Sequence, residues 1–341
     1  MPRIRVEPED FQVEEEPLYR PCGSGPFLHL KIEKRLLNTD EVAQRLAEVL
    51  DLSPREIHWA GRKDRVAVAR QWLSLPADAV AGDPEKLDLG PGIKVLDSAR
   101  HVERLGVGQL ASNFFRLRVR SVVSGWAERA KKRFAELQKK GMPNRYGRQR
   151  FGRDGRNPER GRRVLAGHPL RGGRRTAWLM VTALQSQVFN EVLDRRADAL
   201  DEVWTGDVAL VHDTGELAWV DDAASWEQRV RDFEASATGP LFGTKMHRPK
   251  GPAAVLEAAV LRDFDLPDLA SLKLPRGMRL FGDRRALRVR PSGAEIEYDL
   301  TDSVLHLSFR LPVGSYATVL LDELFPEGYD EGNGLSPRLL G

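Results

Sequence analysis

The residues best suited to chemistry lie in the stretch 59–72, where a single carboxylate, Asp64, stands in a basic surrounding. The cations beside it are Arg62, Lys63 and Arg65. Gly61 predicts a sharp turn because glycine lacks a Cβ, which sets Asp64 at the end of a strand. An ionised carboxylate in a basic field can serve as a nucleophile toward an anionic substrate. An aspartate after a glycine is more often a cap or an Asx-turn residue, so the stretch alone favours that interpretation over a nucleophile.

Patterns typical of metal or cofactor sites are absent from the sequence. The seven histidines are scattered, Cys22 is the single cysteine, and neither a P-loop nor a Gly-x-Ser-x-Gly motif is present. The segment 106–111 fits a dinucleotide fingerprint only superficially, because no strand–turn–helix pattern surrounds it. We therefore expect no metal and no cofactor.

A second chemical signal is the arginine-rich segment between residues 145 and 175, which has eleven arginines against two acidic residues. A charge run is usually a solvated surface. Here Tyr146 and Phe151 are interleaved with the arginines, and guanidinium groups clamp phosphates and stack on bases. The segment therefore predicts RNA contact, for which the candidates are Arg145, Arg148, Arg150, Arg153 and Arg156.

The stretch 113–120 alternates apolar and basic residues, which predicts a strand with one buried face. Phe115 lies on the apolar face, and Arg116, Arg118 and Arg120 lie on the other. The basic face is either solvated or in contact with RNA, and the strand alone favours neither alternative.

The string Ala60-Gly61-Arg62-Lys63-Asp64-Arg65-x-Ala67-Val68-x-x-Gln71 resembles the signature of the TruD family of tRNA pseudouridine synthases. Four further motifs resemble those of the family in the same order. They are Pro8–Glu15, the Asn-x-Phe of 113–115, the long Pro143–Gly152 string, and the Leu-Pro-x-Gly-Ser-Tyr-Ala-Thr of 311–318. The resemblance covers nearly the whole chain.

The resemblance implies roles for particular residues. Asp64 is implied as the catalytic nucleophile, with Arg5 at a basic position where it pairs with Asp64. The substrate-binding residues implied are Phe11, Asn113, Phe115 and Tyr316, with Phe115 as the ring that stacks on the target base. From the residues alone, core packing is the commoner role for Phe11 and Tyr316, and Asn113 is typical of a residue that caps or closes a turn.

The activity implied is the cofactor-free isomerisation of a tRNA uridine, at position 13, to pseudouridine. The uridine is flipped out of its stack, and an aromatic ring replaces its lost neighbours. The carboxylate attacks C1′ of the ribose, as in a retaining glycosidase, or adds to C6 of the ring; the sequence leaves both routes open. A non-catalytic tRNA-binding or RNA-chaperone protein on the same fold is the alternative. An RNA-cleaving enzyme is a weaker rival, because neither a partnered histidine nor metal ligands are evident.

The fold class implied is α/β (α+β), in two domains, which suits a chain of 341 residues. Residues 1–142 and 282–341 form a mixed-sheet pseudouridine synthase catalytic domain. Residues 143–281 form an inserted TruD-specific α/β domain, and the molecule is V-shaped with an RNA-binding cleft. Periodicity and capping signals predict helices at 39–50, 124–140, 183–196 and 317–324, a strand at 27–34, and a hairpin at 295–311.

The composition is that of a soluble globular protein, with 41% hydrophobic and 30% charged residues and a net charge of +3. The amino terminus lacks an apolar h-region, and no apolar run reaches the roughly 18 residues of a membrane span. We expect a cytoplasmic monomer that binds tRNA and needs no membrane, metal or obligate protein partner.

Overall fold

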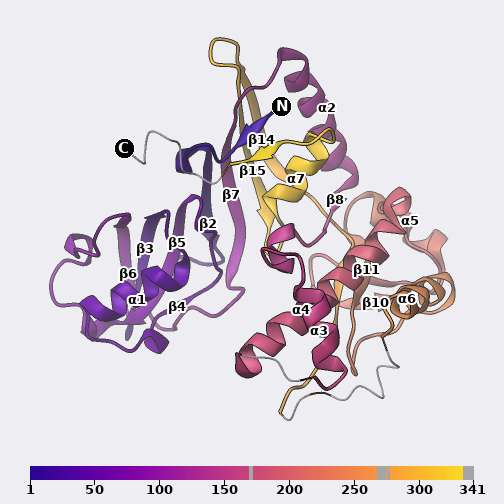
Figure 1. Ribbon diagram of the computed structural model, residues 1–341, viewed down its shortest axis with the longest axis horizontal. Coiled ribbons are helices and arrows are strands. Elements are labelled where there is room, and N and C mark those ends of the chain that lie inside the picture. Colours follow the sequence, from indigo (N-terminus) through magenta and orange to yellow (C-terminus); the bar gives the residue numbers. More distant parts are fainter. Residues whose placement is uncertain (169–171, 267–273, 275–276, 333–341) are drawn as a thin grey trace. The chain divides into compact units, whose positions relative to one another are not determined.

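The computed structural model describes residues 1–168, 172–266, 274 and 277–332 (Figure 1). They form two compact units. The first unit contains Met1–Ala135, Pro291–Gly314 and the segment that begins at Leu324, and the second contains Glu136–Arg290 and Ser315–Glu323. The domain bounds expected above, and the V-shaped arrangement, stay predictions. Among the described residues, none of the helices combines the length and apolar character that crossing a bilayer requires.

The helices in the described part of the chain are α1 (Thr39–Val49), α2 (Ser124–Lys140), α3 (Asn157–Leu165), α4 (Gly173–Asp194), α5 (Ala223–Arg231), α6 (Gly251–Asp263) and α7 (Ala317–Leu324). The strands are β1 (Arg3–Ile4), β2 (Phe11–Pro17), β3 (Phe27–Arg35), β4 (His58–Trp59), β5 (Val68–Pro76), β6 (Ile93–His101), β7 (Leu110–Val119), β8 (Met142–Pro143), β9 (Val208–Val211), β10 (Leu217–Trp219), β11 (Ala235–Leu241), β12 (Asp283–Ala286), β13 (Arg288–Val289), β14 (Ser292–Asp299), β15 (Val304–Pro312) and β16 (Asp330–Glu331).

The main sheet of the first unit has the strand order β14-β15-β7-β2-β5-β3-β6, with β4 also paired to β5. Neighbours are antiparallel, except that β2 and β5 are parallel and pair Gln12 with Val68. Parallel strands begin at the same edge of a sheet. The segment around Phe11, which opens β2, therefore lies beside the segment around Asp64, which leads into β5.

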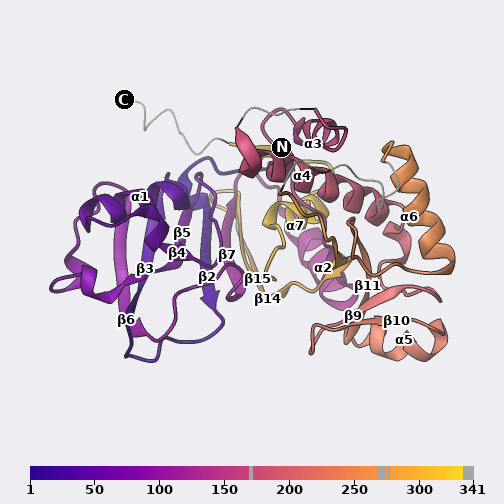
Figure 2. The ribbon, with the colours of Figure 1, turned by 90° about the horizontal axis from the view of Figure 1, so that it is seen from below.

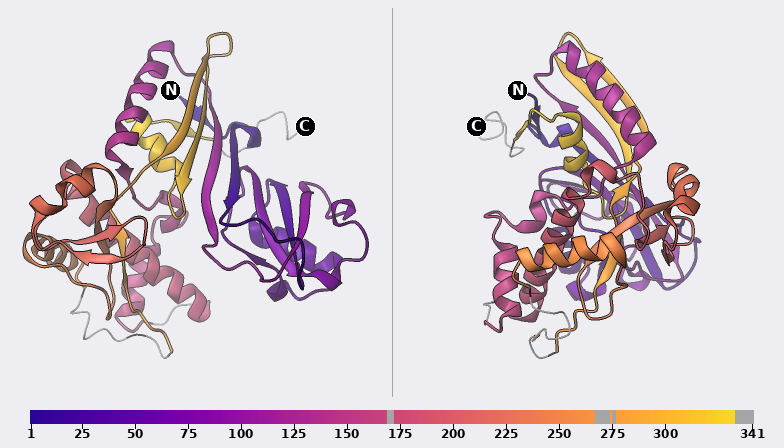
Figure 3. Two further views of the ribbon diagram at one scale, coloured as in Figure 1. Left: turned by 180° about the vertical axis from the view of Figure 1, so that it is seen from behind. Right: turned by 90° about the vertical axis from the view of Figure 1, so that its right-hand side faces the viewer.

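Helix α1 covers one face of this sheet over β3, β5 and β6 (Figures 1 and 2). Its Val42 and Leu46 pack against Leu30 of β3, Leu73 of β5 and Val95 of β6 in one apolar core. Helix α2 lies along the β14–β15 hairpin (Figure 3). The ring centroids of Phe134 and Phe309 are 6.4 Å apart there. The two helices together bury the apolar face of the sheet.

The second unit is built around α4 and an antiparallel sheet with the order β10-β9-β11-β12. On one side of α4, Phe189 packs against the sheet at Ala209. On the other side, Leu184 packs against Val164 of α3 and Val260 of α6. A helix covered on two sides needs apolar residues beyond a single stripe. The observed helix begins at Gly173, earlier than the helix predicted at 183–196.

The predicted α/β (α+β) class and mixed sheet are confirmed. The helices predicted at 124–140 and 317–324 coincide with α2 and α7, and the strand predicted at 27–34 is β3. The predicted helix start near residue 38 is a complete capping box. The Asn38 side chain accepts a hydrogen bond from the Glu41 backbone N–H (2.9 Å), and the Glu41 carboxylate accepts one from the Asn38 N–H (2.7 Å).

Replacement of the cap, Asn38→Ala, should lower the free energy of unfolding by about 1 kcal/mol, because an N–H in the first turn of α1 loses its acceptor. Urea unfolding monitored by circular dichroism measures this. Gln44→Ala on the exposed side of the same helix is the control, with a change within about 0.5 kcal/mol. Equal losses in the two variants would contradict a role for the cap.

Candidate active site

Asp64 lies on the loop that leads into β5, and its side chain is 47% exposed. One Oδ of Asp64 accepts a hydrogen bond from Arg5 Nη2 at 3.3 Å, so the pairing expected from the sequence is present. The Arg5 guanidinium is 12% exposed, stands 4.2 Å from the ring centre of Phe11, and also donates to Glu331 of β16 at 3.2 Å. The Asp64 side chain is thus open to solvent, whereas that of its ion-pair partner Arg5 is largely buried.

Arg5 is held in an unusual backbone conformation, with φ at +54°. A residue with a Cβ pays roughly 1–2 kcal/mol for this left-handed region. Three interactions of its side chain compensate: the Asp64 carboxylate, the Glu331 carboxylate and the face of Phe11. Strain of this kind is typical of positions that aim a side chain at a functional site.

The basic field expected around Asp64 has a different origin from the one predicted. Its sequence neighbours are engaged with other carboxylates: Arg62 with Asp40 (3.1 Å), Lys63 with Glu15 (2.8 Å) and Arg65 with Glu41 (3.4 Å). The cation in contact with Asp64 is Arg5, from a distant part of the sequence. Adjacent side chains of an extended segment point in different directions, so neighbours in sequence are poor partners for each other.

Gly61 also has a role other than the one predicted. Its φ is outside the left-handed region, so the loop does not require the freedom that glycine alone has. A Cβ at this position would meet Lys63 Nζ at 3.5 Å and Glu15 Oε2 at 3.8 Å. These are ordinary contacts, so neither the backbone conformation nor the space at position 61 requires a glycine.

The loop is held from below by Lys34, which is fully buried. Its Nζ donates to the backbone carbonyl of Asp64 at 2.6 Å and to that of Leu37 at 2.5 Å. Burial lowers the pKa of the Lys34 ammonium to about 8, with Lys63 acting in the same direction and the carboxylates of Asp64 and Glu41 acting against it. The backbone of the proposed nucleophile is thus anchored by a lysine without access to water.

A second buried cation joins the loop to the sheet. Lys63 Nζ donates to Glu15 Oε2 at 2.8 Å and to Asn113 Oδ1 at 2.9 Å. Glu15 of β2 and Asn113 of β7 are direct cross-strand partners. Asn113 is half-buried, and it lies on the sheet face that also carries Phe11 and Phe115.

The rings of Phe11 and Phe115 are buried, with 3% and 7% exposure. They meet edge to face with centroids 6.0 Å apart, and Phe115 stacks on Phe309 at 5.3 Å. This packing is that of core aromatics. A base could reach Phe115 only after these rings move, so its predicted stacking role stays a prediction.

The arrangement provides an exposed carboxylate with a buried arginine behind it, a fixed loop backbone and an asparagine amide nearby. Such a set can carry out nucleophilic or acid–base chemistry on a substrate that is itself flipped into the site. Among the described residues no group of three or more His, Cys, Asp or Glu side chains has the arrangement of a metal site.

The comparison with known families supplies the class of this chemistry. The family model described as tRNA pseudouridine synthase D (TruD) matches residues 2–169 and 174–324. The chain belongs to the TruD family.

Similar TruD proteins occur in several bacteria. The chain is 36% identical to a protein named tRNA pseudouridine synthase D from Geobacter metallireducens, covering 95% of each chain. It is 40% identical to one of the same name from Anaeromyxobacter sp. strain Fw109-5, covering 95% of this chain and 93% of the relative. A crystal structure from Methanosarcina mazei that carries the TruD name matches with a TM-score of 0.71 at 23% identity, over 95% of this chain and 93% of the other. That structural likeness shows the fold.

The fifth TruD motif places Tyr316 in the second unit, immediately before α7. Its ring lies 6.2 Å from that of Tyr146, which belongs to the fourth motif. Gly147 is packed so closely here that a Cβ would come within 3.0 Å of the Tyr316 ring. Residues of the two motifs therefore pack directly against each other. The substrate contact of Tyr316 stays a prediction.

The arginines proposed for RNA contact fall into two groups. Arg145 pairs with Asp194 and Arg156 with Glu159, while Arg150 donates to Ser186 and lies against Tyr146. Arg148 and Arg153 are exposed, and within the described residues neither has a side-chain hydrogen bond or ion pair. Arg171, at the far end of the same segment, lies outside the described residues. The exposed pair is the better candidate for phosphate contact.

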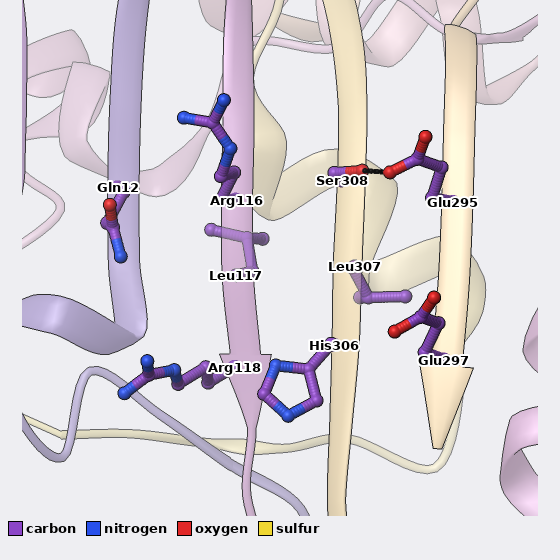
Figure 4. Close-up of a pocket in the computed structure, with 9 residues that line it drawn as sticks. All are labelled: Gln12, Arg116, Leu117, Arg118, Glu295, Glu297, His306, Leu307 and Ser308. Carbon is purple, nitrogen blue, oxygen red and sulfur yellow. Dashed lines mark hydrogen bonds between the residues drawn. The ribbon is translucent and has the colours of Figure 1, made fainter. Parts of the chain in front are cut away.

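The opposite face of the main sheet has a hollow of its own, lined by Gln12, Arg116, Arg118, His306, Ser308 and the two glutamates Glu295 and Glu297 (Figure 4). Of the three arginines predicted on this face, Arg120 pairs with Asp10 and Glu7, and Arg116 lies 4.5 Å from the Phe114 ring and 3.7 Å from Glu14. Mixed charge therefore replaces the uniformly basic face that the sequence predicted. Of the two alternatives left open for this face, solvation is therefore favoured over RNA contact.

Sequence reasoning missed Lys34 and Glu15 as parts of the site, and it placed Lys63 beside Asp64 without its contacts to Glu15 and Asn113. One signal was available for the first two. Lys34 is in phase with the apolar residues Leu30 and Ile32 of β3, and Glu15 is in phase with Val13 of β2. A charged residue on the buried phase of a strand needs a partner, and the TruD site provides it.

The lowered pKa of Lys34 predicts a pH-dependent stability. The folded protein releases this proton near pH 8, whereas the unfolded chain keeps it to about pH 10.4. Between these values the unfolded state binds more protons, so stability rises with pH. Relative to Lys34→Met, the wild type should gain about 3 kcal/mol of unfolding free energy from below pH 8 to above pH 10.4.

Chemical unfolding of both proteins across this pH range measures the gain. Taking the difference between them removes the titrations that the two proteins share. Parallel curves for wild type and Lys34→Met would contradict the assignment of a perturbed lysine at the Asp64 loop.

Proposed function

We propose that this protein isomerises a uridine of tRNA to pseudouridine, with Asp64 as the nucleophile and without a cofactor. The observation that carries the proposal is an exposed Asp64 carboxylate paired with the largely buried Arg5, inside the sequence motif that the TruD family shares. The names of the relatives support tRNA as the substrate class. Position 13 rests on the resemblance of the motifs.

The reaction rearranges one bond. The N1–C1′ bond breaks, the uracil turns, C5 joins C1′, and the proton lost from C5 is balanced by one gained at N1. Asp64 attacks C1′ or adds to C6 and is released unchanged at the end. Arg5 supplies the counter-charge of the carboxylate before attack. The Lys34 hydrogen bond fixes the carbonyl of Asp64, so that the loop does not relax away from the substrate.

Phosphate contacts provide the affinity for tRNA, and the site around Asp64 selects the nucleotide. Flipping a uridine costs a few kcal/mol. Phosphate contacts by exposed arginines such as Arg148 and Arg153 offset that cost. A positively charged segment without the Asp64 site would bind tRNA and leave it unmodified.

The variant Asp64→Asn should lose pseudouridine formation by roughly 10³-fold or more, because an amide is not a nucleophile, while tRNA binding survives. Tritium release from labelled tRNA measures the first, and filter binding the second. Asp40→Asn, which neutralises an exposed carboxylate paired with Arg62, is the matched control and should retain activity.

Full activity of Asp64→Asn would overturn the assignment of Asp64 as the nucleophile. Wild-type protein that binds tRNA and modifies no uridine would favour the non-catalytic tRNA-binding alternative. Mapping pseudouridine in tRNA from cells with and without the protein tests position 13, since loss at another position alone would reassign the target.

The double variant Arg148→Ala/Arg153→Ala should weaken tRNA binding and make it less sensitive to salt. Each lost phosphate contact lowers the slope of log K against log salt by about 1. Measuring the tRNA binding constant at salt concentrations from about 50 to about 300 mM tests this. Arg231→Ala, an exposed arginine paired with Glu227 on α5, should leave the slope unchanged.

A further inference from the structure

The buried pair of Lys63 and Glu15 has no role in the chemistry described above. Their side chains are 6% and 1% exposed. An ion pair this deep loses its hydration, and apolar side chains of similar size often stabilise a protein equally well or better. Stability is therefore a weak account of the pair, and its third contact, to Asn113, points to another one.

Lys63 determines which way the Asn113 amide faces. A lysine ammonium can only donate hydrogen bonds, so the group of Asn113 that it contacts at 2.9 Å must be the carbonyl oxygen. This conclusion does not depend on how the oxygen and nitrogen of the amide are assigned. Glu15 in turn holds Lys63 in place at 2.8 Å. The amide is thus locked in one of its two orientations.

The other end of the locked amide is an available donor. Within the described part of the chain, Asn113 Nδ2 has no hydrogen-bond partner, and the side chain is only half-buried. The atom is also absent from the buried unpartnered polar atoms among these residues, so it remains accessible. Lys63 directly precedes Asp64, which sets this N–H group beside the loop of the proposed nucleophile.

We propose that Lys63 and Glu15 are positioning residues that make Asn113 present an N–H donor, and that this donor selects uracil over cytosine. The proposal rests on the proposed function. Uracil offers a carbonyl oxygen at C4, where cytosine has an amino group. A fixed amide donor pairs with the oxygen and is left facing another donor when the base is cytosine. A buried or enclosed donor without a partner is costly.

Asn113→Asp is the sharpest variant. The carboxylate still accepts from Lys63 through one oxygen, and the remaining oxygen can only accept, so the donor of Asn113 is lost. We expect the melting temperature to be retained and kcat/KM for uridine modification to fall at least about tenfold.

Base preference is measured without turnover in an Asp64→Asn background. Two tRNA transcripts differ only at the modified nucleotide, uridine in one and cytidine in the other. We expect tighter binding of the uridine transcript by about tenfold, and loss or reversal of that preference when Asn113→Asp is added.

The positioning residues are tested by Lys63→Met/Glu15→Leu, which replaces the pair with apolar side chains and leaves the amide free to rotate. The preference for uridine should fall while the protein still unfolds cooperatively. Lys63→Arg should rescue the preference, because arginine also only donates. A purely structural role predicts no change in preference in either variant.

The matched control is Lys31→Met/Glu14→Leu, which removes a lysine–glutamate pair (2.7 Å) on the opposite face of the same sheet. It should leave activity and preference unchanged. Folded Asn113→Asp or Lys63→Met/Glu15→Leu protein that keeps the preference for uridine overturns the proposal. Absence of pseudouridine formation by the wild type would instead overturn the proposed function, because the binding preference is measured separately.

Discussion

The parallel pairing of β2 with β5 is the constraint on which the site depends. It sets the start of β2, with Phe11, next to the start of β5 and the loop before it, which carries Asp64. Every other neighbouring pair in the main sheet is antiparallel, and an antiparallel β2–β5 pair would send the two strand starts to opposite edges. Arg5 reaches Asp64 only because both segments approach from the same side. The left-handed backbone of Arg5 and its contact with Glu331 then hold the guanidinium in place.

Buried cations under the loop are the second structural theme. Lys34 binds the backbone carbonyl of Asp64, Lys63 directly precedes Asp64, and each satisfies carbonyl or carboxylate oxygens that would otherwise be unpaired. Such networks are costly in a low-dielectric interior unless every member has a partner. These networks also orient side chains. A group that can only donate must contact an acceptor atom of its partner, and this determines which atom of the partner is left for a substrate. The loop thus presents the Asp64 side chain to solvent while Lys34 holds its backbone.

Much of the secondary structure follows from local signals. The structure agrees with three such signals: the capping box at Asn38, the periodicity of 124–140 and the alternation in β3. Each signal depends on residues that are close together in the sequence. The charge environment of Asp64 is the opposite case. Arg62 and Arg65 flank it in sequence and bind carboxylates of α1 instead. Gly61 likewise indicates a sharp turn in the sequence, although its backbone needs no glycine. Chain neighbours predict backbone conformation better than they predict side-chain partners, because successive side chains of an extended segment diverge.

The sequence by itself determined the family, the mixed α/β class and the position of Asp64 in a motif, because these depend on residue types at fixed local spacings. Only the tertiary structure decided which cation faces Asp64, which buried lysine holds the backbone of its loop and which end of the Asn113 amide is left open. Those outcomes join residues as far apart as Arg5 and Asp64, or Lys63 and Asn113, through strand order and register. Pairing order in a sheet is a property of the whole chain, since any strand edge offers the same backbone hydrogen bonds. No local spacing encodes it.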